Sequence, residues 1–218
     1  MLDNDDAIAE MQRLGARSIP IVSKGDKFVF AQVLQDVVDF LGIEEDTGPQ
    51  LTPAELAERY LMILDKAIAQ TRAMPDAHLD RELPNRPRSW RVLMHHLFQI
   101  PVAYLDMEDT GETLMYEKLT APPPVDVQTA EQIAAFGEAV KARFAAWFER
   151  VRDEDFSGGV PTYFGGTTRH EMLERTVWHS TQHVRQVGAL LDEVGIASPA
   201  PVTAADIEGL PLTDKVWG

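Results

Sequence analysis

The stretch TVWHSTQHVRQVGALL, residues 176–191, carries two histidines four residues apart, His179 and His183, within the apolar spacing of a helix. Residues at this spacing project from the same side of a helix, so their imidazoles can reach one ion. Gln186 and Leu190 share that side, which indicates that it faces the protein interior. Buried imidazoles need partners, because a buried polar group without a hydrogen bond is costly. A metal ion would satisfy both rings, whereas hydrogen bonds to carbonyl or carboxylate oxygens, or a solvated edge, are the alternatives.

The rest of the chain predicts four long helices, three of which begin with a capping box. In this motif a threonine caps the helix and a glutamate or glutamine three residues later completes a reciprocal pair of hydrogen bonds. The remaining helix begins near Ser89 and contains Pro101, which lacks a backbone donor and predicts a kink. Four helices of this length favour a four-helix bundle. The capping boxes are Thr52–Glu55, Thr129–Gln132 and Thr168–Glu171, and the helices are expected over 53–73, from 89, over 130–152 and from 169 to about 194.

The segments outside these helices divide the chain into three expected parts. Residues 42–51 are acidic and rich in turn-forming residues, which marks a boundary before the bundle. Within the bundle, prolines make residues 119–127 a stiff connection, and glycines make residues 155–171 a loop with room for a short hairpin. A proline-rich tail is expected to wrap the surface. The parts are therefore a front segment 1–45, the bundle 50–196 and the tail 197–218.

Apolar residues recur along the first and third of these helices with the period of a buried helical face. The positions expected to face the core are Leu56, Tyr60, Ile63 and Ile68 in the first helix, and Ile133, Phe136, Val140, Phe144, Trp147 and Phe148 in the third.

A third histidine from the second predicted helix would complete a metal site. His95 and His96 are adjacent, so they point about 100° apart around the helix axis and only one can face the fourth helix. His96 shares an apolar stripe with Val92, Leu93 and Ile100. His95 lies nearer Arg91, and this favours His96. Three neutral imidazoles leave at least one coordination position open, as in reactive rather than structural sites. The other two histidines, His78 and His170, are expected to be solvated.

The composition is that of a globular protein with an acidic surface. Hydrophobic residues make up 44% and charged residues 25% of the 218 residues, and 20 basic against 35 acidic residues give a net charge of −15. This charge argues against a nucleic acid or a membrane surface as partner, because both are bound through clustered Lys and Arg. The first ten residues lack the basic-then-apolar pattern of a secretory signal, and no apolar run approaches the roughly 20 residues that span a bilayer, so we expect a cytoplasmic protein. Without cysteine, a metal must be bound by His, Asp or Glu, and zinc, nickel and iron all suit imidazole.

The stretches SWRVLMHHL, residues 89–97, and HSTQHVRQ, residues 179–186, resemble the DinB/YfiT-like family, and the resemblance extends over about 50–196. In that family a motif beginning with serine carries a histidine seven residues later. The fourth helix carries His-x-x-x-His, with a glutamine three residues after the second histidine. The matching residues are Ser89, His96, His179, His183 and Gln186. The resemblance implies a mainly α fold, a four-helix bundle, with one divalent metal ion (zinc, nickel or iron) on the three histidines.

Relatives in this family include thiol-dependent S-transferases and isomerases that use mycothiol, bacillithiol or glutathione, often as dimers. The resemblance therefore implies a metal-dependent thiol transferase or isomerase that acts on a small-molecule substrate, with a low-molecular-weight thiol as cofactor, as a homodimer. A thiol in the open metal position would lose its proton, and the thiolate would attack an electrophile. Catalytic residues are unknown, since no carboxylate stands out as a general base. Arg185 could hold an anionic group or pair with acidic neighbours at the surface.

Two other hypotheses assign the bundle no catalysis. In the first, the protein is a metal- or small-molecule-binding module whose front segment mediates assembly. In the second, the histidines are buried and hydrogen-bonded within a plain helical domain.

The front segment resembles the second half of a glutaredoxin or thioredoxin fold. GARSIPIV, residues 15–22, is similar to the stretch in which a cis-proline, here Pro20, closes against the redox site. The sequence predicts a helix, a strand at 20–22, a turn at Gly25, a strand at 27–30 and a second helix. The cysteine-bearing half of that fold is missing, so no redox activity is implied. The segment is expected to be truncated, or to serve in packing or dimerisation.

Overall fold

The structure, a computed structural model, describes residues 5–16, 21–31, 33–44, 47–83 and 86–217. It divides into two compact units, Met1–Gly48 and Pro49–Gly218. Among the helices of these described residues, none has the length and apolar character that crossing a membrane requires.

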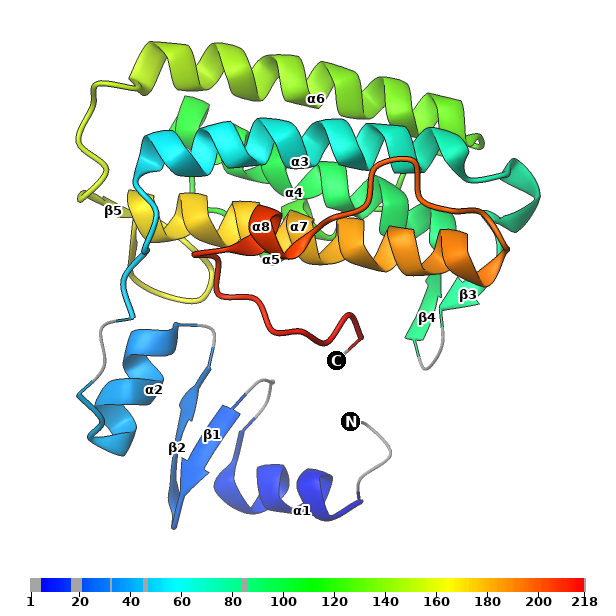
Figure 1. The fold of residues 1–218 in the computed structure, drawn as a ribbon. Helices are drawn as coiled ribbons and strands as arrows, with labels where there is room; N and C mark the ends of the chain where they lie inside the picture. The colour runs from blue at the N-terminus through cyan, green and yellow to red at the C-terminus, as the bar shows by residue number, and fades with distance from the viewer. Residues whose placement is uncertain (1–4, 17–20, 32, 45–46, 84–85, 218) are drawn as a thin grey trace. The chain divides into compact units, whose positions relative to one another are not determined.

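The larger unit is built on four long helices, as predicted (Figure 1). They are α3 (Pro53–Ala73), α4 (Trp90–Thr110), α6 (Ala130–Val151) and α7 (Arg169–Glu193). Helices α3 and α4 each pack against both α6 and α7. The prediction of a mainly helical fold is confirmed, with small antiparallel sheets beside the helices.

Local capping explains where these helices begin. The capping boxes at Thr52, Thr129 and Thr168 all form, and Ser89 caps α4 by accepting a hydrogen bond from the backbone N–H of Val92. Each side-chain oxygen satisfies an amide that the first helical turn leaves without an intrahelical partner. These four signals lie within a few residues of sequence, which is why the helix starts were predictable.

The apolar stripe of each long helix meets those of its neighbours in one core. All four residues expected to be buried in α3 are buried, as are Ile133, Val140, Phe144 and Trp147 of α6. Phe136 and Phe148 are half-buried at the margin of this core. At Gly137 a Cβ atom would lie 2.5 Å from Phe98, so glycine lets α6 approach α4 closely.

Helix α4 continues through Pro101, and a neighbouring helix replaces the hydrogen bond that proline cannot make. Proline has no backbone N–H, which leaves the carbonyl four residues earlier, that of Leu97, without its helical donor. Ser180 of α7 donates its hydroxyl to this carbonyl over 3.0 Å. Since the Ser180 hydrogen is used there, the Tyr60 hydroxyl of α3 is the donor in its 2.8 Å bond with Ser180. A buried chain of hydrogen bonds thus joins three helices next to His96 and His179.

Replacing Ser180 with alanine is expected to lower the free energy of unfolding by about 1–3 kcal/mol, because it leaves the buried Leu97 carbonyl and Tyr60 hydroxyl unsatisfied. Tyr60→Phe is the comparison, since it removes one hydroxyl and leaves the bond from Ser180 to Leu97 in place. Urea unfolding of the metal-free proteins measures both. A smaller cost for Ser180→Ala than for Tyr60→Phe would contradict this account of Pro101.

The connections contain short elements that the sequence did not reveal. A one-turn helix η1 (Asp76–His78) and a hairpin of β3 (Glu82–Leu83) and β4 (Arg86–Ser89) lead into α4. Helix α5 (Tyr116–Leu119) ends at the first residue of the predicted proline-rich connection. The expected short hairpin in the glycine-rich loop is present as β5 (Gly159–Val160) and β6 (Thr167–Thr168).

The C-terminal tail lies against the bundle and contains one short helix, α8 (Ala204–Ile207). Lys66 of α3 forms a 2.8 Å ion pair with Asp206, and Arg59 donates to three tail carbonyls, including that of Asp206. Both basic residues belong to the first long helix, so the tail is fixed along it.

The front unit has the expected order of helix, two strands and helix. These are α1 (Asp5–Leu14), β1 (Ile21–Lys24), β2 (Lys27–Phe30) and α2 (Leu34–Leu41). The strands pair antiparallel, from Ile21 opposite Phe30 to Lys24 opposite Lys27, and Gly25 turns between them with φ of 63°. Pro20, the expected cis-proline, lies outside the described residues. The relation of this unit to a glutaredoxin fold stays a prediction.

Candidate metal site

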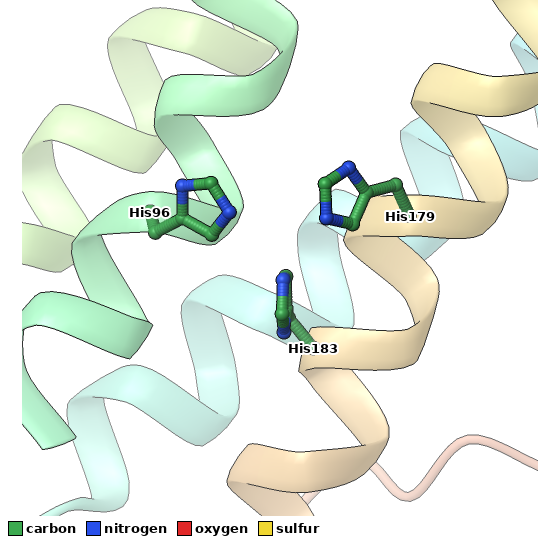
Figure 2. A group of neighbouring side chains, drawn as sticks. All are labelled: His96, His179 and His183. Atoms are coloured by element: carbon green, nitrogen blue, oxygen red, sulfur yellow. The ribbon is translucent and has the colours of Figure 1, made fainter. Parts of the chain in front are cut away.

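Three histidines from two helices converge at one point inside the bundle (Figure 2). His96 comes from α4, and His179 and His183 come from successive turns of α7. Their ring centroids lie 5.0–5.5 Å apart, and one nitrogen from each ring lies within 4.8 Å of the other two. His96 and His183 are buried and His179 is half-buried. The structure thus brings together the three residues that the sequence pattern selected.

A hydrogen bond to a backbone carbonyl fixes the tautomer of His96. Its Nδ1 lies 2.9 Å from the carbonyl oxygen of Leu119, and since that oxygen can only accept, Nδ1 carries the proton. A neutral imidazole has one N–H, so Nε2 carries the lone pair. This is the arrangement in metal-binding histidines, in which the second nitrogen donates to an oxygen that orients the ring.

His183 is oriented in the same way by Gln186, one turn further along α7. Its Nδ1 donates to the Gln186 side-chain oxygen over 2.7 Å. The amide nitrogen of Gln186 in turn donates to the Val216 carbonyl at 3.1 Å, which fixes which end of the amide faces the histidine. The tail residue Val216 therefore supports a histidine of the site through Gln186.

The surroundings keep these rings uncharged. Burial, reinforced by the neighbouring His183 and Arg88, lowers the pKa of His96 to about 3. Burial and the two other histidines hold the pKa of His179 well below its usual range. Both rings are therefore neutral at physiological pH, and the neutral imidazole is the form that binds a metal.

The donor set fits a divalent transition metal. Zinc, nickel and iron all accept imidazole nitrogen, and a site with three protein ligands leaves a position for a further ligand. His96, His179 and His183 are the residues that could hold such an ion.

A pocket of about 140 Å³ opens beside the three histidines. Its walls include apolar side chains from α4, α5 and α7, two arginines and two tyrosines. Tyr116 and Tyr163, with rings 5.6 Å apart, are partly exposed. The loop that bears Tyr163 is fastened to the segment before α5, since the Tyr163 N–H donates to the Leu114 carbonyl over 2.9 Å. Among the described residues that line the pocket, none is a carboxylate.

Comparison with known families agrees with this geometry. The DinB family matches residues 63–208, more than half of the chain, and the matched region contains all three histidines. The protein belongs to the DinB family. No curated protein matches the chain significantly.

The remaining histidines of this DinB-family protein lie elsewhere, and two of them differ from expectation. His95 is buried and stacks on Phe136 at 4.8 Å, away from the site, which agrees with the choice of His96. His170 was expected to be solvated but is half-buried, with Nε2 2.8 Å from the Leu51 carbonyl. His78 is likewise half-buried, with its ring 6.1 Å from that of Trp90. Both lie where helix ends meet loops, contacts that local sequence does not specify.

Arg185 has neither of the roles that the sequence suggested. It donates to the carbonyls of Thr213 and Asp214, at 2.8 and 2.9 Å, and to the side chain of Gln182. Gln182 itself donates to the Val216 carbonyl over 2.6 Å. Arg185 thus helps to fix the tail that supports Gln186, rather than binding an anion or an acidic side chain.

Sequence reasoning missed the pocket arginines, Arg88 and Arg175. For Arg175 a signal existed, because it lies four residues before His179 and so shares its helical face. Arg88 precedes the cap of α4 in a hairpin, where no periodicity marks its direction.

Glu174, beside Arg175, predicts a pH-dependent stability difference. Burial, with the charge of Glu171, raises the pKa of Glu174 to about 7. The folded state therefore favours the protonated acid, and its stability falls as the pH rises from about 4.5 through 7. Because Glu174 is partly exposed, Glu174→Gln is expected to stabilise the protein by only about 1 kcal/mol at pH 8 and to change little at pH 4. Urea titrations at both pH values test this, and an equal effect at both would contradict it.

Proposed function

We propose that the protein is a divalent-metal-dependent enzyme that activates a low-molecular-weight thiol for transfer to, or isomerisation of, a small-molecule substrate. The observation that carries this proposal is the convergence of His96, His179 and His183, with two of the rings oriented through Nδ1. A divalent ion held by these residues would lower the pKa of a thiol that it binds and so make the sulfur a nucleophile near neutral pH.

The chain's own residues supply binding, orientation and exclusion of water. The Leu119 carbonyl and the Gln186 amide hold two of the rings through their Nδ1 atoms, which removes the cost of orienting them when a ligand arrives. Ile100 and Met172 give the pocket apolar walls that exclude water from the histidines. Thiol activation at a metal needs no carboxylate base, and this suits a pocket whose described lining lacks one.

The test begins with metal content and continues to turnover. Purified protein should contain close to one equivalent of zinc, nickel or iron, and Gln186→Ala should bind the ion about 10–100-fold more weakly, as expected for a residue that orients a ligand. Conjugation of glutathione, cysteine and other thiols to an aryl halide should exceed the uncatalysed rate, stop with a chelator and return with metal. Absence of metal even after incubation with excess ion would overturn the proposal.

A metal-loaded protein that binds small molecules tightly without turnover would favour the second function, a non-catalytic binding module. In that case ligand binding would still depend on the ion, but no product would form from any thiol and electrophile pair.

We further propose that the protein is a homodimer assembled through its front unit. In that unit Phe30, Leu34 and Ile43 are 42–57% exposed, although they are large and apolar. The apolar stripe of α6 is used within the bundle core. Sedimentation of the whole chain and of Leu34→Glu tests this, and a monomeric wild-type protein would contradict it.

A further inference from the structure

The pocket beside the histidines is lined by basic residues, although the protein as a whole is acidic. The chain carries a net charge of −15, yet the described lining of this pocket holds two arginines and no acidic residue. Arg88 comes from β4 and Arg175 from α7, so two separate elements contribute positive charge to one small volume. The formal charge of the described lining is therefore positive even without a metal.

Arg175 contacts two aromatic rings and a tyrosine hydroxyl beside the pocket. Its guanidinium lies 4.7 Å from the ring centre of Phe164 and 5.5 Å from that of Trp178, and it donates a hydrogen bond to the Tyr163 hydroxyl. Burial lowers the pKa of Arg175, but a guanidinium stays charged at neutral pH. These contacts set the direction of the group.

Arg88 lines the same pocket from β4. The lining that contains Arg88 also contains His96 and His179. A group placed between the two arginines would therefore also lie near the three histidines.

The size and walls of the pocket restrict what can enter. A cavity of about 150 Å³ lined by apolar groups accepts a molecule the size of benzene, and this pocket encloses about 140 Å³. Ile100, Leu119 and Met172 provide apolar walls, and Tyr116 and Tyr163 add aromatic ones. The ligand is therefore small and has an apolar part as well as a negative charge.

We propose that this pocket binds a small carboxylate, held by Arg175 and Arg88 so that the rest of the molecule lies against the histidines. Guanidinium groups bind carboxylates through paired, charge-assisted hydrogen bonds, which fixes orientation as well as affinity. The identification of this ligand as one of the two reactants rests on the proposed function, whereas the binding of a carboxylate does not. The carboxylate belongs either to the thiol or to the molecule that the thiol attacks.

Calorimetric titration of the full-length protein tests the proposal with acids and their uncharged amides. Succinate and 3-mercaptopropionate are the charged probes, and succinamide and 3-mercaptopropanamide are their neutral counterparts. Titrations run on metal-free and on zinc-loaded protein, because a carboxylate can also bind zinc. In the metal-free protein at least one acid should bind ten times or more tightly than its amide. If both acids bind more tightly than their amides, the carboxylate belongs to a co-substrate. If only 3-mercaptopropionate does so, the carboxylate belongs to the thiol.

Three variants locate the binding. Arg175→Gln and Arg88→Gln should each weaken acid binding by about tenfold or more, as expected when a charge-assisted hydrogen bond is lost. Arg88→Gln makes the test independent of the loop contacts of Arg175. Arg150→Gln is the control, since it removes the same charge from an exposed position on α6 and should change nothing.

Equal affinity for acids and amides, or an equal loss in Arg150→Gln, would overturn this inference. Zinc content and thiol conjugation are measured on the same preparations, so that the two proposals fail separately. Acid binding without turnover would support the carboxylate site and contradict the proposed enzymatic function. Turnover without a preference for acids would support the enzymatic function and contradict the carboxylate site.

Discussion

Replacing His96 with alanine is expected to abolish stoichiometric metal binding, whereas the same substitution at the adjacent His95 is expected to preserve it. Only His96 faces the two histidines of α7, while His95 stacks on Phe136. Loss of a direct ligand should weaken zinc binding by more than the roughly 10–100-fold that loss of an orienting partner costs. Elemental analysis and competition with a coloured chelator give the two affinities.

Thermal unfolding with and without metal provides the control for folding. An ion that binds only the folded state stabilises it by about 2.7 kcal/mol at a concentration of one hundred times its dissociation constant. Wild type and His95→Ala should both gain this stability, although His95→Ala begins from a lower value because its side chain is buried. His96→Ala should gain nothing. Metal loss in His95→Ala alone would show that the helical arrangement around His96 is wrong.

The long helices and the three histidines were predictable because their signals are local. A capping box lies within four residues, and the spacing of His179 and His183 requires only the geometry of one helix. The choice of His96 over His95 needed one further step, the direction of an apolar stripe. The structure agrees because that stripe is buried against the rest of the bundle, including Leu93 and Ile100.

The features that sequence reasoning missed depend on contacts between distant segments. The support of His183 runs through Gln186 to Val216, thirty residues further along the chain. The pocket arginines come from a hairpin and a helix that no local pattern relates. Pro101 predicted a disturbed helix, but only the structure shows that Ser180 donates to the Leu97 carbonyl.

Replacing Arg169 with methionine is expected to lower the free energy of unfolding by about 3–5 kcal/mol, because it leaves the buried carboxylate of Glu108 uncompensated. Arg169 begins α7 and binds Glu108 of α4 through both Nε and a terminal nitrogen, at 2.6–3.0 Å. The side chains are 15% and 5% exposed. The guanidinium also lies 4.4 Å from the ring centre of Phe156. Urea unfolding of the metal-free protein at pH 7 measures the loss.

Glu154, the more exposed of the two carboxylates that bind Arg169, provides the matched comparison. Glu154 binds Arg169 at 2.7 Å, nearly as closely as Glu108 does, but its side chain is 55% exposed. Water screens exposed ion pairs, so Glu154→Gln should cost less than about 1 kcal/mol. If Glu154→Gln proved as costly as Arg169→Met, burial would not be the reason for the effect.

A double variant separates the charge from the packing. Glu108 also accepts a hydrogen bond from the indole N–H of Trp147 at 3.2 Å, and glutamine at position 108 keeps an oxygen for it. Arg169→Met with Glu108→Gln should therefore regain a large part of the stability lost in Arg169→Met, since no buried charge remains without a partner. If instead the unfolding free energies lost in the two single variants added in the double variant, the contact of Arg169 with Phe156 would account for most of the stability that Arg169 provides. In either case metal affinity should change little while the protein stays folded, because His183 is oriented from the other end of α7, through Gln186 and the tail.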